Sequence, residues 1–199
     1  MLLRQSARIN MPRPPRVFVP GLSLHVYQRA HNCSRIFEES VDHECLLDLV
    51  RTATRANGVD VHGFAIMNTH YHLLATPQHK DALPRAMQVI DGGYVRYYNE
   101  KHGRVGTTWC GRYKARLIED ERYWLTCLRY IDLNPVEAKM VTFPEEYPWC
   151  SYRAHALETL AGWLVSHPMY DALGADASAR QRAYRDLCEA GVPKDLLLP

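Results

Sequence analysis

The sequence lacks the features that would mark a membrane or secreted protein. No run of eighteen apolar residues occurs in the 199-residue chain, so no membrane-spanning helix is predicted. The first residues, Met1-Leu2-Leu3-Arg4, lack the apolar core of a signal peptide. The apolar fraction of 47% and the charged fraction of 23% are ordinary for a globular chain. We therefore expect a cytoplasmic protein with one main domain, because this length suffices for one good core.

Paired cysteines are also missing. None of the six cysteines forms a Cys-x-x-Cys pair, and they are scattered over the chain, at positions 33, 45, 110, 127, 150 and 188. Such pairs are the usual sign of a structural zinc site. We therefore interpret the cysteines as reduced thiols that form neither a zinc site nor a disulfide framework.

Acidic residues are absent from residues 1–37, although the whole chain carries a net charge of only +2. The same stretch contains six arginines, among them Arg13 and Arg16 beside Pro14-Pro15. Because the prolines prevent a helix, residues 1–15 are predicted to form a basic, extended N-terminal arm. An arginine-rich arm suits a partner that bears phosphates. An ordinary solvated tail is the alternative.

Hydrophobic periodicity predicts strands that alternate with helices. Strands are expected at 22–29, 59–67, 70–76 and 112–118, and helices at 41–56, from 81 to Gly103, from 119 onward, at 168–173 and at 177–190. In the strand at 59–67, simple alternation places Val59, Val61, Ala65 and Met67 on one face. The pattern indicates an α+β fold.

Two histidines flank one tyrosine at the start of the predicted strand 70–76. Alternate residues of a strand share a face, so His70 and His72 are expected side by side, with Tyr71 in the opposite layer. Two imidazoles held in this way can share one divalent metal and leave positions open for phosphate and water. A pair of solvated strand histidines is the simpler alternative.

The predicted strand 112–118 has cations on one side. Arg112, Lys114 and Arg116 alternate with Tyr113, Ala115 and Leu117. Three cations on one face repel one another unless a negative group lies over them, so this surface is a candidate for contact with phosphates. An edge strand protected by its charge is the alternative.

The helix after residue 119 contains a candidate nucleophile. Tyr130 lies at the border between the buried stripe and solvent, where either a nucleophile or a packing tyrosine fits. Asn134 precedes Pro135 and allows two interpretations. It can cap a short helix at 136–140, or the helix continues and Asn134 lies one turn beyond Tyr130 on the same face.

Taken together, these segments resemble the REP-associated tyrosine transposases, which belong to the IS200-like branch of the HUH single-strand nucleases. The resemblance covers almost the whole chain in the right order, through MPRPPR, MNTHYHLL, GRVGTTWCGRYKARL, RYIDLNPVEAKMV, YPWCSYRAH and SHPMYDALG. It implies the HUH nuclease fold, a ferredoxin-like antiparallel sheet backed by helices. The catalytic domain would occupy residues 16–153, and residues 154–199 would form a short C-terminal helical tail.

The resemblance also implies a site and a reaction. Tyr130 matches the catalytic tyrosine, His70 and His72 match the metal ligands, and Asn134 matches a position that supplies a third ligand in related enzymes. The expected cofactor is Mg²⁺ or Mn²⁺. The expected partner is single-stranded DNA that folds into REP-type palindromic hairpins, cut through a 5′-phosphotyrosine intermediate. No obligate protein partner is expected.

The candidate DNA-contacting residues combine cations with one aromatic ring. They are Arg112, Lys114, Arg116, Tyr113, Arg13 and Arg16. The chain departs from the family pattern at Cys110, Glu137 and Lys139, where an acidic or amide residue, an arginine and a glycine are usual. These departures bear on DNA affinity or target preference and leave the proposed metal and nucleophile positions untouched.

Three other functions remain open at this stage. The first is a domesticated hairpin-DNA-binding protein with little or no cleavage. The second is a replication or mobilisation initiator with the same chemistry, for which no helicase or partner domain is visible. The third is an unrelated metal-dependent hydrolase that uses His70 and His72 but not Tyr130.

Overall fold

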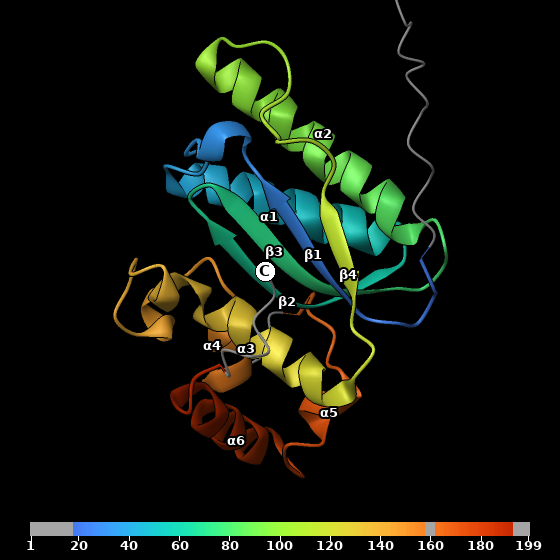
Figure 1. Ribbon diagram of the computed structural model, residues 1–199, viewed down its shortest axis with the longest axis vertical. Coiled ribbons are helices and arrows are strands. Elements are labelled where there is room, and N and C mark those ends of the chain that lie inside the picture. Colours follow the sequence, from blue (N-terminus) through green and yellow to red (C-terminus); the bar gives the residue numbers. More distant parts are fainter. Residues whose placement is uncertain (1–17, 158–161, 193–199) are drawn as a thin grey trace, which may run out of the picture.

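The computed structural model describes residues 18–157 and 162–192 (Figure 1). A central sheet separates two helices on one side from the remaining helices on the other. The predicted N-terminal arm at 1–15 lies outside the described residues, and so do Arg13 and Arg16. None of the helices in the described part of the chain is long and apolar enough to cross a membrane.

The four strands form one antiparallel sheet in the order β2-β3-β1-β4. They are β1 (Leu24–Arg29), β2 (Val59–Met67), β3 (His70–Pro77) and β4 (Lys114–Leu117). The chain order β1-α1-β2-β3-α2-β4 on this sheet is the ferredoxin-like arrangement. The predicted fold class is therefore confirmed. The strand predicted at 112–118 is shorter than expected and lies at the sheet edge.

Helices α1 (Ser40–Ala56) and α2 (Ala82–His102) cover one face of the sheet. Helix α1 begins with a capping box between Glu39 and Asp42, which satisfies backbone N–H groups of the first turn. Helix α2 ends at Gly103, whose φ of +59° is the left-handed conformation that favours glycine. The buried side chains of both helices meet Tyr71 and Leu73 of β3 in one core cluster.

Helix α3 (Glu121–Glu137) packs on the opposite face of the sheet, and the C-terminal elements lie against its far side. The C-terminal helices are α4 (Tyr152–Ala156), α5 (Pro168–Asp171) and α6 (Ala177–Glu189). Two 3₁₀ turns lie at His31–Cys33 and Pro144–Glu146. Tyr170 and Tyr184 join Leu128 and Ile131 of α3 in a second core cluster. The helical tail predicted from the sequence is thus present in the described residues.

The simple alternation expected for β2 is wrong. The register between β2 and β3 shifts between Val61 and Gly63, so one extra residue interrupts the pairing. Val61 and Phe64 therefore both pack toward α1 and α2, whereas Ala65 packs toward α3. A β-bulge has this effect because it moves all later side chains to the other face.

The structure also decides between the two interpretations of Asn134. Helix α3 runs through Pro135 and ends at Glu137, so Asn134 does not cap a separate helix. Proline lacks the N–H that would bond to the carbonyl of Ile131, and this penalty is tolerated in the last turn. Asn134 consequently lies one turn beyond Tyr130 on the same side of α3.

Candidate active site

The two histidines of β3 lie side by side, as the strand pattern predicted. The ring centroids of His70 and His72 are 5.0 Å apart, and both rings lie on the face of the sheet that α3 covers. Tyr71 points to the opposite face, where its hydroxyl donates a hydrogen bond to Asp91 Oδ1 at 2.7 Å. Strand β1 contributes Tyr27 to the same site, with its ring 4.9 Å from that of His72.

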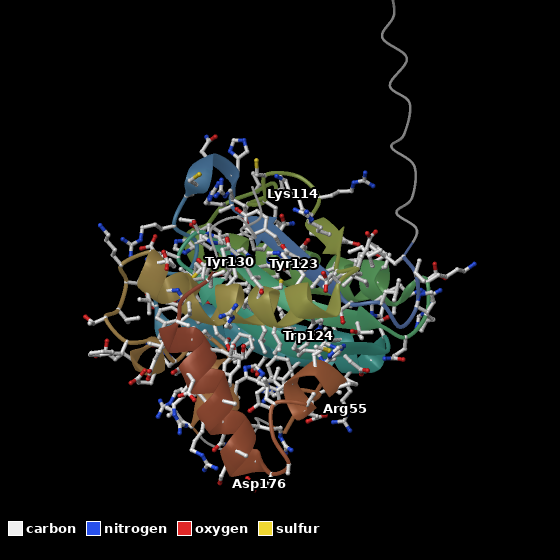
Figure 2. The ribbon with its side chains drawn as sticks, turned by 60° about the horizontal axis from the view of Figure 1, so that its bottom comes forward. Arg55, Lys114, Tyr123, Trp124, Tyr130 and Asp176 are labelled. Carbon is white, nitrogen blue, oxygen red and sulfur yellow. The ribbon has the colours of Figure 1, made fainter. Side chains whose placement is uncertain are left out.

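Helix α3 brings the candidate nucleophile to these histidines. The ring centroid of Tyr130 lies 5.6 Å from that of His72, and Asn134 Nδ2 lies 3.4 Å from His72 Nε2. In Figure 2, Tyr123 and Tyr130 lie on the side of α3 toward Lys114, whereas Trp124 lies on the other side. The structure thus brings together His70, His72, Tyr130 and Asn134, four residues that were selected from two distant segments.

The imidazoles of the site are neutral at pH 7. Burial, reinforced by the cation of Arg29, lowers the pKa of His70 to about 4. Burial also holds the pKa of His72 well below its usual value, with smaller contributions from His25, His70 and Arg29. A neutral imidazole has a free lone pair on one nitrogen, which is the state that binds a metal.

The hydrogen bonds leave one ring nitrogen of each histidine for a ligand. His70 Nδ1 lies 2.9 Å from Thr69 Oγ1, and His72 Nδ1 lies 2.8 Å from His25 Nε2. Nε2 of His70 therefore remains for a ligand, and Nε2 of His72 faces only the Asn134 amide at 3.4 Å, whose oxygen would be the third ligating group. Two imidazoles and an amide fit a divalent cation that takes its other ligands from phosphate and water. The amide is needed for a third ligand, because no group of three or more His, Cys, Asp or Glu among the described residues could hold a metal.

A cleft of about 600 Å³ opens over the two histidines and Tyr130. Three predicted DNA-contacting residues, Arg112, Lys114 and Arg116, line it from the edge-strand side, and all three are exposed. Tyr113 does not join them, because it is buried in the core on the other face of the sheet. The cleft thus combines the candidate nucleophile, the candidate metal ligands and cations, and no Asp or Glu among the described residues lines it.

Sequence reasoning missed four residues of β1 that line this cleft, His25, Tyr27, Gln28 and Arg29. Alternation in the predicted strand 22–29 places three of them, His25, Tyr27 and Arg29, on one face, opposite Leu24 and Val26. The sequence did not predict that they line the cleft, because this depends on the pairing of β1 with β3, which sets Tyr27 opposite His72. Of the departures from the family pattern, Cys110 lines the cleft, whereas Glu137 and Lys139 are exposed at the end of α3.

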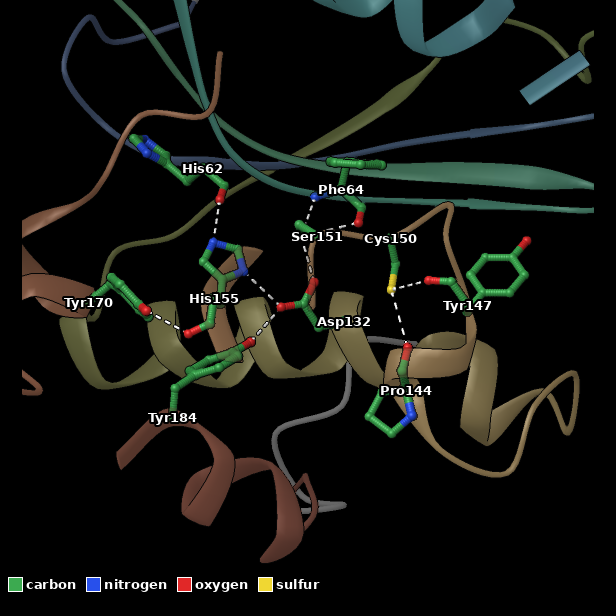
Figure 3. A network of polar contacts seen from close by, with 10 residues as sticks. All are labelled: His62, Phe64, Asp132, Pro144, Tyr147, Cys150, Ser151, His155, Tyr170 and Tyr184. Carbon is green, nitrogen blue, oxygen red and sulfur yellow. Dashed lines mark hydrogen bonds and ion pairs between the residues drawn. The ribbon is translucent and has the colours of Figure 1, made fainter. Parts of the chain in front are cut away.

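A buried polar network holds α3 from the side away from the cleft (Figure 3). Asp132 is completely buried, and its two carboxylate oxygens accept hydrogen bonds from the Ser151 hydroxyl at 2.5 Å and the Tyr184 hydroxyl at 2.7 Å. His155 Nδ1 lies 2.9 Å from the same carboxylate, and His155 Nε2 lies 2.9 Å from the carbonyl of His62. The network ties α3, the helix of the candidate nucleophile, to β2 and to the tail.

Comparison with known proteins places this geometry in context. The sequence model of the family described as "Transposase IS200 like" matches residues 18–134, a segment that contains both histidines and Tyr130. A solved REP-associated tyrosine transposase bound to a REP hairpin superposes with a TM-score of 0.62 at 15% identity, over 80% of this chain and 93% of that one. At this identity the superposition establishes a shared fold.

Two further comparisons add little. A Deinococcus radiodurans R1 protein described as a transposase gives a TM-score of 0.41 at 20% identity, over 56% of this chain and 89% of that one. The comparison with curated protein sequences gave no match. The family match spans more than half of the chain and includes the residues gathered in the cleft. The chain therefore belongs to the IS200-like transposase family.

Proposed function

We propose that this protein is a metal-dependent single-strand DNA endonuclease and strand transferase that acts on palindromic hairpins of the REP type. The observation that carries the proposal is the convergence of Tyr130 with the neutral imidazoles of His70 and His72 in one cleft lined by cations. The family to which the chain belongs supports a role in handling transposon DNA.

His70, His72 and Asn134 would hold Mg²⁺ or Mn²⁺ beside Tyr130. The bound ion would neutralise the oxygens of the scissile phosphate and polarise the phosphorus. The exposed cations of the cleft would keep the flanking phosphates in place, so that the phosphorus lies in line with the Tyr130 hydroxyl.

The reaction forms one bond and breaks one bond. The hydroxyl oxygen of Tyr130 attacks the phosphorus and gives up its proton, and the bond from phosphorus to the 3′ oxygen breaks. The departing 3′ oxygen takes up a proton and becomes a free hydroxyl, while the 5′ end remains on the tyrosine. Because the phosphodiester link is conserved, attack by another 3′-hydroxyl can rejoin DNA without an energy-rich cofactor.

The hairpin substrate is proposed from the solved relative, which is bound to a REP hairpin and shares the fold. The positive, open cleft beside the edge strand suits a single strand that leaves a folded stem. Four cations would follow its backbone, Arg29, Arg112, Lys114 and Arg116.

Covalent capture tests the proposal. The protein is incubated with labelled single-stranded hairpin DNA from its own genome, with Mn²⁺ or Mg²⁺, and separated on a denaturing gel. Wild type is compared with Tyr130→Phe and with the double variant His70→Ala/His72→Ala. We expect a metal-dependent labelled protein band that both variants lose.

Other outcomes of this experiment are equally informative. A band that survives Tyr130→Phe moves the nucleophile to another tyrosine, of which Tyr123 is the first candidate. Tight hairpin binding without any band favours a domesticated DNA-binding protein. Cleavage of small esters that is indifferent to Tyr130→Phe favours an unrelated hydrolase.

A further inference from the structure

We propose that His25 on β1 is a positioning residue that holds His72 in the tautomer with its proton on Nδ1, so that Nε2 is free to bind the metal. This inference rests on the proposed function only in taking His72 as a metal ligand. Its basis is the geometry around the two rings.

The two imidazoles form a close, buried pair. His25 Nε2 lies 2.8 Å from His72 Nδ1, and the rings stack with centroids 5.0 Å apart and an interplanar angle of 20°. Only 7% of His25 and 3% of His72 is exposed, so water does not compete for the bond. Each residue sits in a central strand of the sheet, which fixes its backbone on both sides.

A proton count assigns the direction of this hydrogen bond. A neutral imidazole carries one N–H, so one nitrogen donates and the other accepts. Asn134 presents its Nδ2 amide donor 3.4 Å from His72 Nε2, and that nitrogen must therefore accept. The proton of His72 is then on Nδ1 and is donated to His25 Nε2. His25 in turn carries its own proton on Nδ1.

Metal ligation through His72 Nε2 requires this same tautomer. The free nitrogen is thus prepared before any ion arrives, and no proton has to move between the ring nitrogens when it does. Metal-bound histidines ordinarily have such a partner for the second nitrogen, most often a carboxylate or a backbone carbonyl. The partner here is a second imidazole.

The choice of an imidazole suits the charge of the cleft. The groups packed against His25 are Arg116 opposite it on β4, His72 on β3 and the Tyr130 ring at 5.8 Å from α3. In the part of the chain that the structure describes, no Asp or Glu lines the cleft. A carboxylate in place of His25 would repel the phosphates of bound DNA, whereas a neutral imidazole orients His72 without adding negative charge.

Two variants separate the hydrogen bond from simple packing. His25→Phe keeps a planar ring but removes the acceptor, whereas His25→Gln keeps an oxygen that can accept the Nδ1 proton. The first readout is the ¹⁵N spectrum of histidine-labelled, metal-free protein, which distinguishes the two tautomers of His72. The second is Mn²⁺ affinity, from the paramagnetic resonance signal of the free ion. Circular dichroism confirms that each variant is folded.

We expect His72 of the wild type to carry its proton on Nδ1. His25→Phe should lose this preference and bind Mn²⁺ about 10- to 100-fold more weakly, as outer partners of metal ligands usually show, and His25→Gln should recover much of both. The inference is overturned if wild-type His72 carries its proton on Nε2. It is also overturned if His25→Phe matches the wild type in both readouts.

The control Tyr130→Phe keeps these tests apart from the proposed function. It should lose covalent capture of DNA but keep the tautomer and the Mn²⁺ affinity. If the wild type forms no covalent complex and His25→Phe still changes both readouts, the proposed function fails while the positioning role of His25 stands.

Discussion

Two histidines of the cleft, His25 and His70, are costly to protonate in the folded protein. Burial lowers the pKa of His25 and of His70 to about 4, and Arg116 and Arg29 reinforce the effect on each. A buried imidazole in an apolar environment is easier to keep neutral than charged. The two imidazoles are therefore neutral at neutral pH, the state that the proposed metal binding requires, and they resist protonation.

This property predicts a loss of stability in acid. The unfolded chain binds protons at a pKa of 6.5 and the folded chain only near 4, so lowering the pH through this window favours unfolding. Each of the two imidazoles should remove on the order of 1–2 kcal/mol from the unfolding free energy at pH 5. Urea unfolding of metal-free protein at pH 7.5 and pH 5 measures the difference.

Histidine variants provide the control for this measurement. His25→Gln/His70→Gln should lose less stability between the two pH values than the wild type does. His79→Gln changes an exposed histidine outside the cleft and should leave the pH dependence unchanged. An equally steep loss in the double variant would show that the acid sensitivity arises elsewhere.

Among the structural elements, α3 is the one that contacts the cleft on one side and a buried polar network on the other. One side presents Tyr130 and Asn134 to the histidines, and the other side buries Asp132 against β2 and the tail. A buried carboxylate is tolerable only when its oxygens are hydrogen-bonded, as they are here (Figure 3). The network fixes the rotation of α3 and with it the direction of Tyr130.

Removal of this carboxylate should destabilise the protein. Asp132→Ala removes the partner of His155 and Tyr184 and leaves the Ser151 hydroxyl only the longer bond to the Phe64 carbonyl at 3.2 Å. We expect a loss of roughly 3 kcal/mol in unfolding free energy. Tyr184→Phe removes one hydroxyl and should cost about 1 kcal/mol. Chemical denaturation with two spectroscopic probes measures both values.

The matched control is Asp186→Ala, an exposed carboxylate on α6, which should change stability by less than about 0.5 kcal/mol. Equal effects of Asp132→Ala and Asp186→Ala would mean that the buried network contributes nothing beyond an ordinary surface charge.

Some of these elements could be predicted from the sequence, and others could not. The histidine strand, the cationic strand and the Tyr130 helix were predictable because each depends on local periodicity. The faces of β2 were not, since the bulge at His62 and Gly63 depends on packing of that segment against Leu128 and Ser151. His25 was not found because its partner is set by the pairing of β1 with β3. The buried role of Asp132 needed the fold of the tail.

For the whole molecule, charge position matters more than net charge. The chain carries only +2, yet Arg29, Arg112, Lys114 and Arg116 line one cleft, and none of the described residues that line it is acidic. The field over this cleft therefore favours a polyanion far more than the total charge indicates.

Binding of hairpin DNA should accordingly depend on salt. Lys114→Ala/Arg116→Ala should reduce the slope of log affinity against log salt concentration by roughly 1 to 2 units, because about 0.7 counterions are released per single-strand phosphate contact. Fluorescence anisotropy of labelled hairpin DNA, measured between about 50 and about 200 mM salt, gives the slope. The control Arg182→Ala removes an exposed cation on α6, outside the cleft, and an equal reduction there would contradict the assignment.

The position of Asp132 has a practical consequence for anyone who wishes to shorten the protein. The family match ends at Asn134, which invites expression of a minimal fragment without the tail. Such a fragment would lack His155 and Tyr184, so the Asp132 carboxylate would lose these hydrogen-bond partners. The apolar side of α3 that packs against the tail would also be exposed. A fragment meant to fold by itself therefore has to extend through α6, and a fused partner belongs beyond that helix.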